Sequence, residues 1–197
     1  MIPIKNKKKA LEVTVEQMRK FSFSYLEKYS PSKQQLKTYL LKKYLKTGTF
    51  NIKKQDIVDL IDVVILDLEK TKFISDKFYS DNKAKNLVQR GSSINKIRNY
   101  LISKGIKDKY IKETILKINE NNEDQDFFSA IKICKKKRIG PSRTEENRKL
   151  FYKKDISILA RNGFDFETSK RVMDLEKDDY LKIISLIKKQ IYGMTLI

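Results

Sequence analysis

The chain has 197 residues, of which 40% are apolar, so it is long enough and apolar enough to fold around a core, and its composition excludes a disordered protein. Its 44 Lys and Arg residues outnumber its 25 Asp and Glu residues, and the net charge of +19 is spread over the whole chain. Such a positive field predicts a polyanionic partner or an acidic protein surface. Because Lys far outnumbers Arg, an A/T-rich genome is an alternative explanation for part of this charge.

The residue types exclude several kinds of chemistry. The chain has no His and a single Cys, Cys134, which excludes His-dependent nucleophilic catalysis, His-ligated metals, thiolate zinc sites and an internal disulfide. Its six glycines never have the spacing of a phosphate-binding loop. No uncharged apolar segment approaches the roughly 18 residues of a membrane span, and the first residues lack the apolar core of a signal peptide. We therefore expect a cytoplasmic protein, with no membrane association, that is not an enzyme and needs no cofactor or metal.

Apolar residues recur at helical spacing along nearly the whole chain. In chain order, the first strong pattern covers residues 57 to 68 and the last lies near residues 177 to 191. Gly105 and Gly163 each end one such stretch and precede another, which suits a residue with positive φ at the end of a helix. A hairpin turn at Asn162 and Gly163 is the alternative, although the flanking residues lack the alternation of strands.

Two helix starts and one buried group are also predicted. Ser30 followed by Pro31 is typical of an N-cap with Pro at the first helical position. Ser142 and Glu145 have the spacing of a capping box. Cys134 falls on an apolar stripe, so we expect a buried thiol.

The sequence also contains an internal similarity. The stretch "RGSSINKIRNYLISKGIKDKYIKETI", residues 90 to 115, is similar to "ILARNGFDFETSKRVM", residues 158 to 173, with Gly105 matching Gly163. In the other direction Ser32 matches Ser93, and the apolar residues that follow match as well. We predict an all-α protein of tandem three-helix repeats with an extra C-terminal helix, and chance similarity between Lys-rich helices is the alternative. The predicted units cover residues 11–75, 76–122, 123–175 and 176–197.

The second and third units resemble a known family. "SDKFYSDNKAKNLVQRGSSINKIRNYLISKGI" is similar to the central repeat of the RecX regulatory proteins, and "ILARNGFDFETSKRVM" is similar to the third repeat. The first unit matches more weakly and departs from the family by placing "KYLKTGTFNIKK" between two helices. The motif positions that match are Asp76, Tyr79, Gly91, Gly105, Gly163 and Phe164.

The resemblance implies a function as well as a fold. A RecX-like protein is an elongated, curved helical protein that lies in the groove of the RecA filament on DNA and impedes its growth, ATP turnover and strand exchange. No catalytic residues come with this family, and the matched positions are interpreted as caps, turns and packing. The C-terminal helix has no clear counterpart. We expect a monomer whose partners are the RecA filament and single-stranded or double-stranded DNA.

Basic residues recur on the predicted helices of all three units, where they are available to phosphates or to acidic side chains. Exposed lysines that only keep the protein soluble are the alternative for any single position. Tyr39 and Tyr100 lie beside these charges and either stack on bases or pack in the core. The predicted RecA- and DNA-binding residues are Lys33, Lys37, Lys43, Lys96, Arg98, Lys104, Lys135, Lys136, Lys137, Arg138, Arg143 and Arg148.

Other hypotheses fit the sequence less well. The acidic residues that begin at Asp174 imitate a calcium loop, but Asp179 stands where such a loop needs Gly. Asp56, Asp59 and Asp62 are expected on exposed helix faces, whereas a metal-dependent nuclease needs carboxylates that converge. The principal alternative to a RecA regulator is therefore a stand-alone DNA-binding architectural protein that uses the same basic face.

Overall fold

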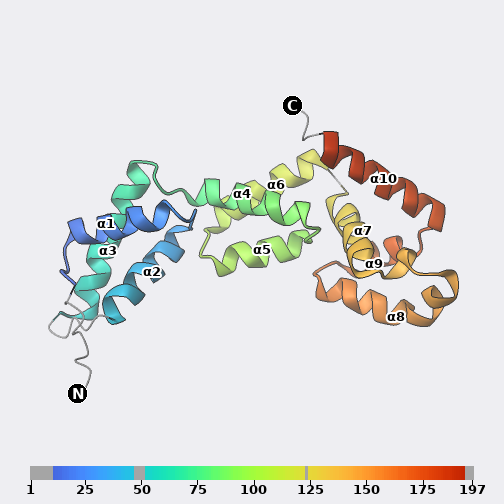
Figure 1. Ribbon diagram of the computed structural model, residues 1–197, viewed down its shortest axis with the longest axis horizontal. Helices are drawn as coiled ribbons and strands as arrows, with labels where there is room; N and C mark the ends of the chain where they lie inside the picture. The colour runs from blue at the N-terminus through green and yellow to red at the C-terminus, as the bar shows by residue number, and fades with distance from the viewer. Residues whose placement is uncertain (1–10, 47–51, 123, 194–197) are drawn as a thin grey trace, which may run out of the picture. The chain divides into compact units, whose positions relative to one another are not determined.

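The computed structural model describes residues 11–46, 52–122 and 124–193 (Figure 1). Within these ranges the chain forms α-helices and one short 3-10 helix, and no strand is present, so the predicted all-α class is confirmed. The helices are α1 (Val15–Leu26), α2 (Lys33–Lys46), α3 (Lys54–Lys70), α4 (Asp76–Gln89), α5 (Ile94–Ser103), α6 (Asp108–Asn121), α7 (Gln125–Lys137), η1 (Gly140–Ser142), α8 (Glu145–Arg161), α9 (Phe166–Met173) and α10 (Lys177–Gly193).

The chain divides into two compact units by its internal contacts. Unit 1 contains Met1–Ser80 and Ile102–Tyr110, and unit 2 contains Asp81–Leu101 and Ile111–Ile197. Helices α4, α5 and α6 therefore each contribute residues to both units. The assignment of three repeats and a C-terminal segment stays a prediction.

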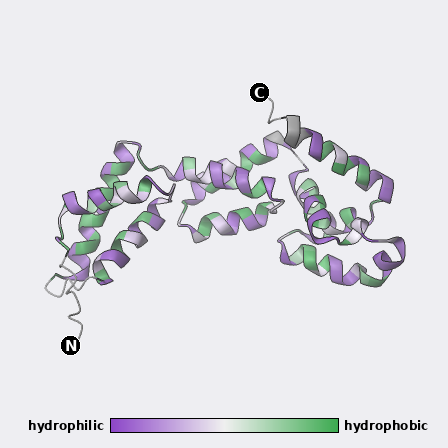
Figure 2. Ribbon diagram, in the orientation of Figure 1, coloured by the Kyte–Doolittle hydropathy of each residue, from purple (hydrophilic) through white to green (hydrophobic). Residues whose placement is uncertain are grey.

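Unit 1 is held together by the apolar faces of α1, α2 and α3. The predicted stripe on α3 is buried along its length, from Ile57 to Leu68, and it packs against Met18 of α1 and Leu40 and Tyr44 of α2. Figure 2 shows that the helices carry hydrophilic and hydrophobic residues together, as expected when only one face of each helix is buried. The hydrophobic effect on these faces stabilises the unit, while the charged faces remain in water.

Unit 2 has its own core, which lies between α7, α8, α9 and α10. Ile131 and Cys134 of α7 are fully buried beside Leu159 of α8 and Val172 of α9, and Tyr180 of α10 completes the cluster. The predicted buried thiol is confirmed, and burial raises the pKa of Cys134 to about 12. This thiol is therefore protonated and unreactive at neutral pH. The predicted C-terminal helix is confirmed as α10.

The predicted helix ends are confirmed and the predicted helix starts are wrong. Gly105 and Gly163 have φ of 72° and 88°, and α8 is followed by α9, so no hairpin forms at Asn162 and Gly163.

Helix α2 begins two residues later than predicted, because Ser32 forms the capping box: its backbone N–H donates to Gln35 Oε1 (3.0 Å). A second capping box was predicted at Ser142 and Glu145, but the Ser142 hydroxyl instead donates to the carbonyl of Cys134 (3.1 Å).

A set of hydrogen bonds and close contacts around Ser32, which we call a joint, fixes the start of α2 in unit 1. The Ser32 hydroxyl accepts from the Gln35 backbone N–H (3.2 Å) and donates to the carbonyl of Lys104 (2.7 Å). Asp76, the first residue of α4, accepts from the backbone N–H of Lys33 (2.9 Å). Gly105 lies against α2 so closely that a Cβ atom there would be 2.6 Å from the Cβ of Gln34. Two orphan N–H groups of α2, those of Lys33 and Gln35, are thus satisfied by a carboxylate from another helix and by the Ser32 cap.

The same joint recurs in unit 2 at the start of α5. The Ser93 hydroxyl accepts from the backbone N–H of Lys96 (3.1 Å) and donates to the carbonyl of Asn162 (2.9 Å). Asp126 of α7 accepts from the backbone N–H of Ile94 (2.8 Å). A Cβ atom on Gly163 would lie 2.5 Å from the Ser93 hydroxyl oxygen. The similarity of Ser32 to Ser93 and of Gly105 to Gly163 in the sequence thus has a common structural reason.

Both joints keep a carboxylate in a partly buried position. Burial raises the pKa of Asp76 and of Asp126 above the ordinary range, although the backbone N–H bonds lower it. Because the folded-state pKa is raised, each ionised carboxylate costs stability above that pKa. These carboxylates offset part of this cost by satisfying N–H groups that would otherwise be unpaired.

Replacement of either cap serine tests the joints. We expect Ser32→Ala and Ser93→Ala each to lower the free energy of unfolding by about 1–2 kcal/mol, because each loses a helix cap and a bond to a distant carbonyl. Urea denaturation at constant m-value measures the change. Ser157→Ala is the matched control, since that exposed hydroxyl bonds only within its own helix (to Lys153 O, 2.9 Å). An effect no larger than that of Ser157→Ala would contradict the role of the joints.

The remaining motif positions lie in the folded core or at a turn. Tyr79 and Phe164 are buried. Gly91 has φ of 79°, and a Cβ atom there would be 3.0 Å from the Cβ of Lys132. These residues have no exposed face for a ligand.

Candidate functional site

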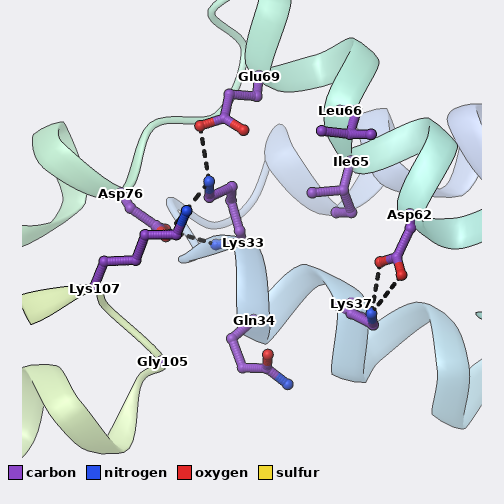
Figure 3. Close-up of a pocket in the computed structure, with 10 residues that line it drawn as sticks. All are labelled: Lys33, Gln34, Lys37, Asp62, Ile65, Leu66, Glu69, Asp76, Gly105 and Lys107. Carbon is purple, nitrogen blue, oxygen red and sulfur yellow. Dashed lines mark hydrogen bonds and ion pairs between the residues drawn. The ribbon is translucent and has the colours of Figure 1, made fainter.

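Two of the predicted binding lysines have carboxylate partners on α3. Lys33 Nζ lies 2.8 Å from Glu69 Oε1 and 4.0 Å from Asp76 Oδ2, and Lys37 Nζ lies 2.6 Å from Asp62 Oδ1 (Figure 3). Burial by itself would lower the pKa of Lys33, but the bond to Glu69 and the neighbouring negative charges raise it instead. Both lysines are thus paired with the protein's own acids.

The same residues line a depression in unit 1. Its charged lining consists largely of the pairs just described, together with Lys107, and Ile65 and Leu66 of α3 supply apolar surface (Figure 3). A pair of opposite charges presents little net field to a ligand. Lys33 and Lys37 therefore offer little free positive charge to a polyanion.

Arg143 in unit 2 is bound to a buried acid. Its guanidinium makes two hydrogen bonds to Asp155, Nε to Oδ2 (2.6 Å) and Nη2 to Oδ1 (2.9 Å), and lies over the ring of Phe151 (4.6 Å). Asp155 is 0% exposed and also accepts from the backbone N–H of Gly140 (2.8 Å). This two-pronged contact fixes the loop between α7 and α8.

Arg148 binds backbone carbonyls at the C-terminal end of α9. Its Nη2 donates to the carbonyls of Met173 (2.9 Å) and Leu175 (2.6 Å), at and beyond the end of α9, and its Nη1 lies 3.3 Å from Glu145. A cation that satisfies these carbonyls also interacts favourably with the helix dipole. The structure thus gives Arg143 and Arg148 internal roles.

The other predicted residues of the first two units lie on α2, on α5 and directly after α5. Lys43 Nζ lies over the ring of Phe21 (3.9 Å) in a cation–π contact, and Lys96 Nζ lies 3.5 Å from Asn162 Oδ1. Lys96 is exposed, whereas Arg98 and Lys104 are half-buried. Their role in binding stays a prediction.

Four consecutive exposed cations, Lys135, Lys136, Lys137 and Arg138, form what we call the basic cluster at the end of α7. Arg138 has φ of 55°, and a Schellman motif ends the helix, in which the N–H of the next residue, Ile139, donates to the carbonyl of Cys134 (3.1 Å). Ile139 is buried, so the chain turns inward there and leaves the four cations outside. Cations at a helix C-terminus are favoured by the dipole, and these remain accessible to a polyanion.

A second feature of the structure was only partly predicted. Tyr25 stacks on Tyr39 (ring centroids 4.1 Å apart, planes at 15°) and contacts Tyr29 (4.9 Å, 42°). We call Tyr25, Tyr29 and Tyr39 the tyrosine ladder. Of these three tyrosines, the sequence pointed only to Tyr39, and the four-residue spacing of Tyr25 and Tyr29 was the available signal for the other two.

The geometry can be compared with known proteins. No family model matches the chain. The chain is 28% identical, over 85% of its length and 89% of the relative's length, to the regulatory protein RecX of Myxococcus xanthus (strain DK1622). Its fold is similar to the crystal structure of a regulatory protein RecX, with a TM-score of 0.56 over 82% of this chain and 74% of that chain, at 15% identity.

The chain is similar in sequence and in fold to RecX regulatory proteins. The sequence relative covers most of both chains, and the solved RecX structure shares the all-helical fold. The resemblance predicted from the second and third units is therefore confirmed. Since 85% of this chain matches the sequence relative, the likeness to RecX is not confined to those two units.

Among the described residues, no helix is long and apolar enough to cross a membrane. In the same part of the chain, no group of three or more Cys, Asp or Glu side chains is placed to hold a metal ion.

Proposed function

We propose that the protein is a regulator that binds the RecA filament on DNA, inhibits or modulates its recombinase and ATPase activities, and has accessory affinity for DNA. The observation that carries this proposal is the relation to RecX over 85% of the chain. The net charge of +19 supports it, because a RecA filament assembled on DNA presents a polyanion. The absence of catalytic residues among those matched to the family favours a binding mechanism.

The proposed mechanism is steric and electrostatic. The helical repeats would bridge successive RecA protomers, with exposed cations directed at DNA phosphates or at acidic residues of the filament. The basic cluster in unit 2 is the best candidate for this contact, because its four cations are consecutive and exposed. Lys33, Lys37, Arg143 and Arg148 would instead maintain the shape of the protein through their internal contacts.

A RecA ATPase assay tests this function. On single-stranded DNA at physiological salt, we expect strong inhibition when the protein is present at well below one copy per RecA, because a filament is blocked by few bound molecules. The measurement is the ATPase rate over a titration of the protein at fixed RecA and DNA.

The same assay addresses the alternative of a stand-alone architectural protein. Inhibition that begins only when the protein coats the DNA would contradict a RecA regulator and favour competition for DNA. A control with the concentration of DNA doubled separates the two, since competition for DNA then needs twice as much protein.

A further inference from the structure

The tyrosine ladder ends in a ring that faces solvent. Tyr29 is 58% exposed, although it is a large aromatic side chain, and it lies three residues beyond Leu26, the last residue of α1. Its backbone N–H donates to the carbonyl of Tyr25 (3.0 Å), and Pro31 two residues later prevents the helix from continuing. The local sequence therefore holds Tyr29 near the end of α1, next to the ring of Tyr25.

The inner rings of the ladder make its outer ring rigid. Tyr25 lies between Tyr29 and Tyr39, and both neighbours contact its ring. An aromatic side chain that is already held by its neighbours loses little further conformational freedom when a flat ligand binds. The ladder thus consists of a stacked pair, Tyr25 and Tyr39, and one exposed ring, Tyr29, tilted by 42° against Tyr25.

Lysines lie close to the tyrosine ladder along the chain. On α2, Lys42, Lys43 and Lys46 follow Tyr39 at spacings that place them on the same side of the helix, and Lys43 Nζ lies 5.9 Å from the centre of the Tyr39 ring. Lys28 precedes Tyr29 and is exposed, as are Lys42 and Lys46. Glu27 is the one acidic residue in this set of neighbours along the chain. Aromatic rings flanked by lysines match the two parts of a single strand, its bases and its phosphates.

We propose that the tyrosine ladder binds single-stranded nucleic acid, with a base stacked on Tyr29 and neighbouring phosphates near Lys28, Lys42 and Lys46. The inference deepens the accessory DNA affinity in the proposed function and rests on it. A single strand fits better than a duplex, because the bases of a duplex already stack on one another and do not offer a free face. Stacking is tolerant of sequence, so weak base preference is expected.

The test is binding of a labelled single-stranded oligothymidylate, without RecA, measured by fluorescence anisotropy at several salt concentrations. We expect Tyr29→Ala to weaken binding about five-fold or more, because loss of one stacked base corresponds to at least that factor. Tyr29→Phe keeps the ring and is expected to bind like the wild type. Phe166→Ala is the matched control, since Phe166 is 69% exposed but lies between Asp165 and Glu167.

The salt dependence separates the roles of the rings and the lysines. Tyr29→Ala is expected to leave the slope of log affinity against log salt unchanged, whereas Lys42→Gln with Lys46→Gln lowers the slope by roughly 1.4, about 0.7 for each phosphate contact. A Tyr29→Ala variant that binds like the wild type, or that weakens duplex and single strand equally, would overturn the proposal. If the wild-type protein does not bind the oligonucleotide at all, the accessory DNA affinity fails too, whereas RecA inhibition is measured independently.

Discussion

Replacing Asp155 by Ala is expected to lower the free energy of unfolding by about 3 kcal/mol, the largest effect on stability that we predict for a single substitution. Asp155 is 0% exposed, and its removal leaves the Arg143 guanidinium and the Gly140 N–H without their acceptor. An unpaired cation in a partly buried position is costly. We place the effect at the low end of the usual range, because the Arg143 side chain is 22% exposed and can recover some hydration.

Chemical denaturation followed by circular dichroism measures this effect. Asp124→Ala is the matched control: its carboxylate also binds an arginine, Arg171 (3.1 Å), but the pair is exposed. Such a surface pair contributes about 0–1 kcal/mol. If Asp155→Ala destabilised the protein no more than Asp124→Ala, the buried pair would not be what fixes the loop between α7 and α8.

The helices themselves could be predicted because their cause is local. The apolar stripe from Ile57 to Leu68 and the pattern near residues 177 to 191 depend only on spacing along the chain, and both became helices with that face buried. The positive φ of Gly105 and Gly163 was predictable for the same reason, since glycine after a helical pattern tolerates a backbone that other residues avoid.

The helix starts were not predictable from local signals alone. Both Ser30 and Ser32 are good N-cap residues in the sequence, and Pro31 favoured the first. What selects Ser32 is its bond to the carbonyl of Lys104, a residue distant along the chain. The internal similarity of Ser32 to Ser93 contained this information, but its meaning became visible only when both hydroxyls were seen in equivalent joints.

The candidate site was only partly predictable, because charge on a helix face does not reveal its partner. Lys37 and Arg143 look like surface cations in the sequence, yet each meets a carboxylate that folding brings within hydrogen-bonding distance. The basic cluster differs, because its four cations are consecutive, and the turn at Arg138 leaves all of them outside. An Arg residue with positive φ cannot be recognised in a sequence, whereas a Gly residue after a helical pattern can.

Neutralising the basic cluster is expected to have the largest effect on binding. In the triple variant Lys135→Gln, Lys136→Gln, Arg138→Gln, the slope of log affinity against log salt should fall by about 2.7 on duplex DNA and by about 2.1 on single strands, if each cation contacts one phosphate. At physiological salt this variant is also expected to need at least about ten-fold more protein to inhibit the RecA ATPase, since each lost charge contact weakens the attraction. Stability should fall only modestly, because all three side chains are exposed and lose only a favourable interaction with the helix dipole.

The control must remove the same charge from another place. The triple variant Lys149→Gln, Lys153→Gln, Lys170→Gln does so, since these lysines of α8 and α9 are also exposed. Its net charge equals that of the cluster variant, so a general effect of the protein's field would weaken binding equally in both. A decrease confined to the cluster variant locates the contact at the end of α7. Equal decreases would mean instead that the charge of +19 acts as a diffuse field, and the basic cluster would lose its assigned role.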